Sequence, residues 1–190
     1  MKSFSDQERE IIRRKLLECC EESWSKYGYK KTNIRELCEA AGISTGAFYM
    51  FFPSKEHLFF ETAQYVGDRI DAIAYEELPK NPTKQDFARA LKKMFKEFEK
   101  VEWYLRLEDE LTLIVRKLPP GYMGTASTKD MADLSKMIAR FRLVPKIDME
   151  KLLKVLSVLS MSILHKNLLG EGFDDAFAFL LDSAVEKMFR

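Results

Sequence analysis

Apolar side chains recur every three or four residues along most of the chain, which is the period of amphipathic helices. The first stripe consists of Ile12, Leu16, Cys20, Trp24 and Tyr27. Ser5 and Glu8 can form a capping box at its start, and Gly28 follows its end. The pattern predicts a helix from about residue 5 to residue 27.

Later stripes predict further helices. Their approximate ranges are 54–75, 83–102, 103–118, 128–141, 148–169 and 174–189. The segment 119–124 holds two prolines and two glycines and is expected to be a loop. Only eight glycines and six prolines occur in 190 residues, which leaves room for long helices. The predicted fold is all-α, with an N-terminal three-helix domain, a C-terminal helical domain and about nine helices in total.

A helix-turn-helix is predicted between residues 33 and 52. Asn33 can cap the first short helix, and Gly42 stands where a left-handed residue would end it. Ser44 can cap the second helix, and Pro53 ends it. In such pairs the second helix lies in the major groove with its N-terminal residues near base edges. The segment therefore predicts double-stranded DNA as a partner.

Gly-Ile-Ser-Thr-Gly-Ala-Phe-Tyr at 42–49, followed by Phe-Pro-Ser-Lys-Glu at 52–56 and Leu58, resembles the DNA-binding signature of the tetracycline-repressor (TetR) family of bacterial transcriptional regulators. The resemblance covers residues 5 to 75; beyond them it is one of helical layout and length. It implies a homodimeric repressor whose C-terminal domain binds a small-molecule effector and then releases operator DNA. It does not identify the effector, the operator or the regulated genes.

Within this signature, Thr45, Gly46 and Ala47 are expected to meet base pairs, and Tyr49 and Lys55 to meet phosphates. The complete predicted DNA-binding set is Thr32, Asn33, Arg35, Ser44, Thr45, Gly46, Ala47, Tyr49, Met50, Phe51 and Lys55.

Met50 and Phe51 depart from the family pattern, which often has His or Tyr at this place. Neither side chain can hydrogen-bond a phosphate or a base, so they either contact DNA through apolar surface or pack inward. The net charge of the whole chain is only +1. Residues 26–55, however, carry five basic and two acidic side chains, a local net charge of +3. The alternative is a helical ligand-binding or protein-interaction module that no longer binds DNA specifically.

The predicted domains are residues 1–53, which bind DNA, and residues 54–190, which bind the effector and dimerise, with helix 54–75 as connector. The helices 148–169 and 174–189 carry apolar residues around most of their circumference. Each must therefore be buried on more than one side. A four-helix bundle built from two helices of each subunit satisfies this requirement, so a homodimer is predicted.

The effector pocket is expected between helices of the second domain. Its candidate lining residues are Trp103, Tyr104, Glu108, Tyr122 and His165, set among apolar side chains. The same composition is typical of an ordinary helical core, so each residue can equally serve packing.

Other functional classes lack a sequence signal. Cys19, Cys20 and Cys38 have no metal-ligand spacing and suit a reducing compartment. No phosphate-binding loop, paired-histidine motif or nucleophile elbow occurs, so neither an enzyme nor a cofactor or metal is predicted. The sequence shows no signal peptide and no long apolar run. The expected location is cytoplasmic, without a membrane partner.

Overall fold

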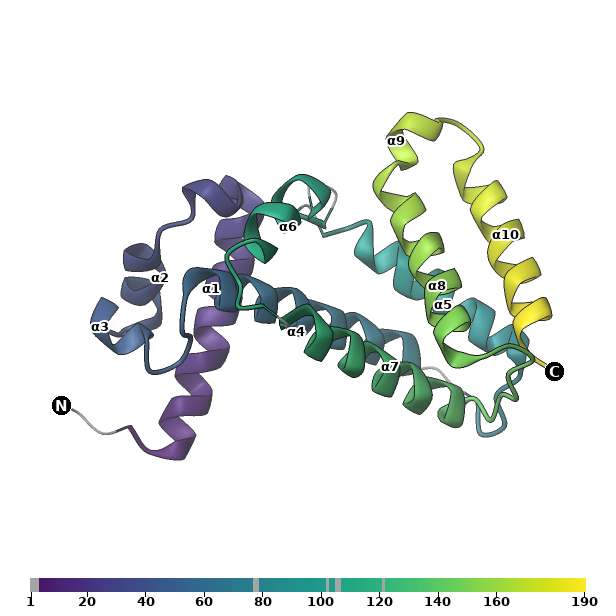
Figure 1. Ribbon diagram of the computed structural model, residues 1–190, viewed down its shortest axis with the longest axis horizontal. Helices are drawn as coiled ribbons and strands as arrows, with labels where there is room; N and C mark the ends of the chain where they lie inside the picture. The colour runs from purple at the N-terminus through teal and green to yellow at the C-terminus, as the bar shows by residue number, and fades with distance from the viewer. Residues whose placement is uncertain (1–3, 77–78, 102, 105–106, 121) are drawn as a thin grey trace. The chain divides into compact units, whose positions relative to one another are not determined.

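The computed structural model describes residues 4–76, 79–101, 103–104, 107–120 and 122–190, without the side chains at 74–75, 107–109 and 123–130. The described chain forms ten helices and no β-strand apart from one isolated bridge (Figure 1). The helices are α1 (Asp6–Lys31), α2 (Ile34–Ala41), α3 (Thr45–Phe48), α4 (Lys55–Tyr75), α5 (Lys84–Phe98), α6 (Leu107–Val115), α7 (Tyr122–Arg140), α8 (Met149–Leu164), α9 (Lys166–Leu169) and α10 (Phe173–Met188). The predicted all-α class is confirmed.

Side chains near the helix starts explain where several helices begin. The capping box of α1 forms as predicted: the backbone N–H of Glu8 donates to Ser5 Oγ at 3.3 Å, and Ser5 N–H donates to Glu8 Oε2 at 2.8 Å. Thr83 and Asp86 form a second capping box at α5. Asp148 accepts a hydrogen bond at the start of α8.

Several helix ends differ from the prediction: α5 ends at Phe98 and not near residue 102, and the predicted helix 148–169 is divided at His165 into α8 and α9. The helix α7 begins at Tyr122, inside the expected loop 119–124, because prolines are tolerated just before and within a first turn, where no helical N–H donor is needed. The helix α1 does not stop at Gly28 but continues to Lys31 across a break, where Gly28 has φ 77° and ψ 170°. A residue with φ in this region is strained unless it is glycine.

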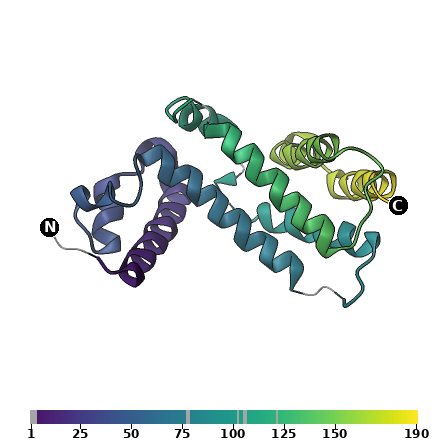
Figure 2. The same ribbon diagram turned by 60° about the horizontal axis from the view of Figure 1, so that its bottom comes forward.

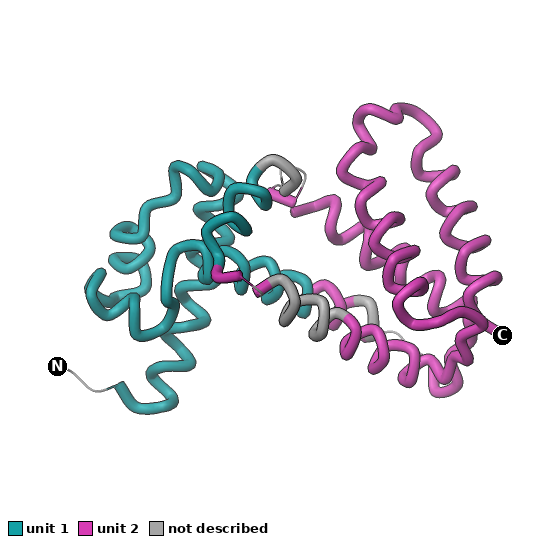
Figure 3. The backbone as a smooth tube through the Cα atoms, in the orientation of Figure 1, with its two compact units in different colours: residues 1–69, 106–118 teal, residues 70–105, 119–190 magenta. Residues whose placement is uncertain are grey.

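The chain folds into two compact units (Figure 3). The first unit comprises residues 1–69 and 106–118, and the second comprises 70–105 and 119–190. The predicted boundary between residues 53 and 54 therefore does not coincide with the boundary of the first unit. Most of α4 and all of α6 pack with the N-terminal helices. The predicted functional division remains a prediction.

The first unit has an aromatic core. Trp24 of α1 lies 4.7 Å from Phe59 of α4, centroid to centroid, and Phe48 of α3 lies 5.9 Å from Phe52. These four side chains are at most 1% exposed. The first pair joins α1 to α4, and the second joins α3 to the segment that leads into α4, so the helix-turn-helix rests on a packed base.

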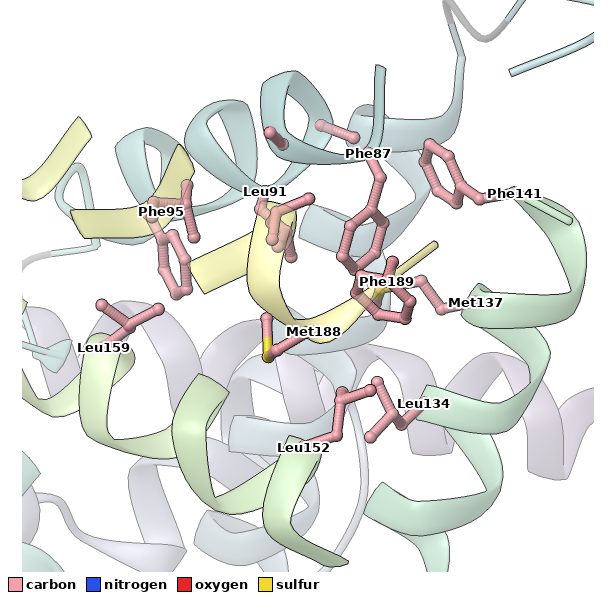
Figure 4. Close-up of a cluster of buried hydrophobic side chains, with 14 of the residues drawn as sticks. Phe87, Leu91, Phe95, Leu134, Met137, Phe141, Leu152, Leu159, Met188 and Phe189 are labelled. Atoms are coloured by element: carbon pink, nitrogen blue, oxygen red, sulfur yellow. The ribbon is translucent and has the colours of Figure 1, made fainter. Parts of the chain in front are cut away.

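The second unit has its own core between α5, α7, α8 and α10 (Figure 4). Phe87 of α5 meets Phe141 and Phe189 edge to face, with centroid distances of 5.0 and 5.2 Å. The helices α8 and α10 lie side by side in both views of this unit (Figures 1 and 2). Each buries one apolar face against the core, through Leu152 and Ile163 in α8 and through Leu181 in α10.

Candidate nucleic-acid interface

The first helix of the helix-turn-helix, α2, is defined at both ends by local interactions. The Arg35 N–H donates to Asn33 Oδ1 at 3.0 Å, which caps the start of the helix. Gly42 adopts the left-handed conformation, with φ 76° and ψ 29°, and ends it. The N–H of Ile43 then donates to Cys38 O at 2.9 Å. The chain is thereby turned directly into α3.

The second helix, α3, presents its N-terminal residues to solvent. The Ala47 N–H donates to Ser44 Oγ at 3.2 Å. Ser44, Thr45 and Gly46 are exposed and Ala47 is half-buried, whereas Phe48 at the end of the helix is fully buried. The buried ring anchors the C-terminal end of α3, and the predicted base-contacting residues at its start are accessible to solvent.

Two glycines in this turn should respond differently to substitution. Gly42→Ala is expected to lower the free energy of unfolding by about 1 kcal/mol, because alanine is strained at positive φ even though no atom lies within 4 Å of the new Cβ. Gly46→Ala is the matched control: its nearest neighbour, Ser44 Oγ, is 4.0 Å away and its φ is ordinary. Urea unfolding of the two variants measures the difference, and equal effects would contradict the strain argument.

Tyr49 directly follows α3 and is 58% exposed. Its ring packs edge to face on buried Phe48, with centroids 5.3 Å apart. The aromatic body is thus held in one direction while most of the side chain remains open to solvent. This is the geometry expected of a tyrosine whose hydroxyl meets a phosphate.

Phe51 packs against the start of α1 and the residue Phe4 that precedes this helix. Its ring centroid lies 5.8 Å from that of Phe4 and 5.4 Å from the Arg9 guanidinium carbon. The guanidinium group of Arg9 donates to Met50 O at 3.2 Å, and that of Arg13 donates to Phe51 O at 3.2 Å. Of the two alternatives, the structure therefore has Phe51 packed inward.

Lys55 points away from the predicted phosphate position. Its Nζ donates to Tyr29 O at 2.6 Å and lies 4.6 Å from the centre of the Tyr29 ring. Burial lowers the pKa of the Lys55 ammonium, an effect that the neighbouring Glu56 carboxylate opposes. The structure gives this ammonium an internal carbonyl as its partner in place of DNA.

Thr32 also has a structural role in place of the predicted phosphate contact. Its side chain is buried, and its hydroxyl donates to Gly28 O at 2.9 Å and accepts from Ser23 Oγ at 2.9 Å. The neighbouring Asn33 and Arg35 are exposed. Arg35 Nε lies 3.0 Å from Glu39 Oε1, an exposed pair that contributes little to stability.

Sequence reasoning missed Arg9, Arg13 and Glu110. The two arginines hold the carbonyl ends of the turn after α3. Glu110 of α6 accepts hydrogen bonds from Trp24 and Tyr29 of α1. No local sequence pattern predicts these roles, because the hydrogen-bonded partners are 38 to 86 positions apart in the chain.

The predicted effector residues differ in burial and in their places along the chain. Trp103 and Tyr104 are adjacent and buried, and the Tyr104 hydroxyl lies 2.8 Å from Ser160 Oγ of α8. Burial raises the pKa of Tyr104, so its hydroxyl stays protonated. Tyr122 is half-buried at the start of α7, and His165 is exposed where α8 ends. The side chain of Glu108 lies outside the described residues.

A surface hollow of about 400 Å³ lies between α5 and α10, away from these residues. Its charged groups pair with one another: Lys84 Nζ is 2.5 Å from Glu186 Oε1, and Lys92 Nζ is 2.7 Å from Asp182 Oδ2. Within the described ranges, no group of three or more His, Cys, Asp or Glu could hold a metal ion. None of the helices searched there is long and apolar enough to cross a membrane.

Comparison with known proteins places the N-terminal helices in a sequence family. Residues 16–62 match the family described as "Bacterial regulatory proteins, tetR family". The HTH-type transcriptional repressor Rv1474c of Mycobacterium tuberculosis is 34% identical over 77 residues, which are 40% of this chain and 41% of that repressor. The chain spans less than half the length of the curated relatives that it matches.

Solved structures extend the likeness of fold to nearly the whole chain. A TetR transcriptional regulator from Rhodococcus sp. RHA1 has a TM-score of 0.64 and 19% identity, covering 94% of this chain and 96% of its own. RolR, solved in complex with resorcinol, has a TM-score of 0.60 and 20% identity, covering 96% and 95%. Because the sequence identities are only 19% and 20%, this likeness concerns the arrangement of the helices alone.

Proposed function

The chain belongs to the tetR family of bacterial regulatory proteins, and on this premise we propose that it binds operator DNA as a homodimer and represses transcription until a small molecule releases it. The single observation that carries the proposal is the surface of α3, where the capped, exposed turn Ser44–Gly46 lies beside exposed Tyr49. The major groove of DNA can admit an exposed helix start of this kind, which is supported by a packed core.

The proposed DNA contacts are a smaller set than the sequence predicted. Ser44, Thr45, Gly46 and Ala47 would lie near base edges, and Tyr49 near a phosphate. Asn33 and Arg35 at the exposed start of α2 would contact the DNA backbone. The N-terminus of that helix also favours a negatively charged phosphate at this place. For Met50, a place near the groove remains a prediction. Phe51, Lys55 and Thr32 are left out of the set, because their side chains make contacts within the first unit.

Dimerisation is proposed through α8 and α10. Each helix carries exposed apolar side chains, which together are proposed as an apolar stripe: Val158 and Met161, three positions apart in α8, are 63% and 53% exposed, and Phe179 and Leu180, adjacent in α10, are 71% and 55% exposed. Large apolar side chains gathered in this way are typical of a protein interface. A twofold axis would bring the same stripe of a second copy against them.

The effector is proposed to bind in the second unit near Trp103 and Tyr104. Both side chains are buried among aromatic neighbours, and Tyr104 lies 4.8 Å from Phe98, centroid to centroid. The Tyr104–Ser160 pair supplies hydroxyl groups in this apolar surrounding. The structure of RolR with resorcinol has the same fold, which supports a small organic molecule as the class of effector.

Selection from a random pool of DNA duplexes tests the proposal directly. The wild-type protein should enrich one partly palindromic sequence, because the two half-sites mirror the twofold symmetry of a dimer. Its preference over a scrambled duplex should persist at physiological salt. Equal binding to all duplexes, or none, would favour the alternative of an interaction module.

Tyr49→Phe should weaken binding to the selected duplex by about tenfold, which corresponds to about 1.4 kcal/mol for one hydrogen bond to a charged group. The stability should stay unchanged, because the ring that packs on Phe48 is retained. Fluorescence anisotropy gives the affinity. Tyr27→Phe is the matched control, since this tyrosine of α1 is also about half exposed, at 48%, but lies outside the proposed interface. Equal affinities for wild type and Tyr49→Phe would remove the phosphate assignment.

A further inference from the structure

The break in α1 at Gly28 is occupied by a carboxylate from α6. The Tyr29 N–H, just after the break, donates to Glu110 Oε1 at 3.0 Å. The indole N–H of buried Trp24, one turn earlier, donates to Glu110 Oε2 at 2.5 Å. A Cβ atom at Gly28 would lie only 2.6 Å from Glu110 Oε1. The site therefore needs both the glycine and a side-chain acceptor.

Tyr29 is held at every polar atom. Its N–H bonds Glu110, its carbonyl accepts from Lys55 at 2.6 Å, and its hydroxyl donates to Glu56 Oε1 at 2.5 Å. Lys117, which follows α6, donates to the same hydroxyl at 3.0 Å and lies 3.5 Å from Glu56 Oε1. The hydrogen bond to Tyr29 and the charge of the neighbouring Glu56 carboxylate raise the pKa of the Lys117 ammonium. All these groups belong to the first unit.

The position of Tyr29 matters because residues 30–33 lead from it directly into α2. A helix that breaks leaves N–H groups without their usual carbonyl partners, and an unsatisfied buried N–H is costly. Glu110 supplies the missing acceptor. Its two oxygens each face a donor, so a carboxylate fits where an amide, which carries one NH₂ group, does not.

We infer that Glu110 is a positioning residue of the helix-turn-helix. Its carboxylate fixes the backbone at the break in α1 around Gly28, and so determines where the segment leading into α2 begins. This inference rests on the proposed DNA-reading function. Residues 106–118 are flanked along the chain on both sides by residues of the second unit. A shift of this segment by the length of one hydrogen bond would break the bond between Glu110 and the Tyr29 N–H. Residues 30–33, which connect Tyr29 to α2, would then be less firmly positioned.

Glu110→Gln tests the inference with two measurements. Amide hydrogen exchange reports on the junction without DNA, and exchange at Tyr29 and in residues 30–33 should become at least about tenfold faster. Affinity for the duplex selected by the wild type should fall by about tenfold, within the usual range of coupling between two sites. Glu21→Gln is the matched control, because the Glu21 carboxylate also receives two hydrogen bonds in the same unit, from Arg69 at 2.6 and 2.9 Å.

The outcomes separate the two proposals. The inference stands if Glu110→Gln changes exchange and affinity while Glu21→Gln changes neither. It is overturned if Glu110→Gln leaves exchange at Tyr29 as in the wild type, or if both variants lose affinity equally. Failure of the wild-type protein to enrich any duplex would reject the proposed function, while exchange would still decide the role of Glu110.

Discussion

Phe179→Glu is expected to convert the protein from a dimer into a monomer and to abolish operator binding. Phe179 is 71% exposed on α10 and belongs to the apolar stripe proposed to meet a second copy. In a twofold interface each substitution acts twice, so a loss of about 2–4 kcal/mol per copy would total roughly 4–8 kcal/mol. This corresponds to at least about a thousandfold weaker association. Analytical ultracentrifugation at micromolar concentration measures it.

The control for this experiment is Val144→Glu. Val144 is also an exposed apolar residue of the second unit, at 53%, but it lies between α7 and α8 and outside the stripe. It should leave the dimer intact. A monomeric wild-type protein, or a Phe179→Glu variant that remains dimeric, would contradict the proposed interface. The monomeric variant should keep its helix content, since no core side chain is removed.

Phe87→Ala is expected to destabilise the second unit by about 3–5 kcal/mol, the usual cost of removing a fully buried aromatic ring. Phe87 is 0% exposed and touches Phe141 and Phe189, which follow the ends of α7 and α10 (Figure 4). Because the ring joins three segments, little rearrangement can fill the cavity. Domain stabilities are commonly about 5–15 kcal/mol, so a large fraction would be lost.

Urea unfolding followed by circular dichroism measures this loss. Phe87→Leu is the matched control, because leucine retains much of the apolar volume and should cost about 1–1.5 kcal/mol. The packing account of this core fails if the alanine variant unfolds at the same urea concentration as the leucine variant. Both variants should be compared at one protein concentration, since dimerisation also contributes to stability.

Features that depend on neighbours in the chain were predictable. The capping box at Ser5, the Asn33 and Ser44 caps and the left-handed Gly42 all involve partners within a few residues. Such interactions are set by backbone geometry that recurs in every helix.

The direction of a long side chain was not predictable where its partner is distant in the sequence. Nothing near Lys55 indicates that its ammonium meets Tyr29 O, 26 positions earlier, or that Phe51 packs against Phe4 and Arg9. Thr32 was expected at the surface and is buried, since Ser23 and Gly28 lie beside it in the folded unit. The rotamer that each of these side chains adopts depends on the residues that the fold brings next to it.

The sequence alone determined the helical class, the helix-turn-helix and the apolar character of α8 and α10, because period, caps and glycine positions are local properties. Only the tertiary structure decided which apolar residues of those two helices are buried and which form the exposed stripe. It alone also brought Glu110 to the break at Gly28. Both outcomes depend on packing between segments far apart in the chain, and periodicity within one helix carries no information about them.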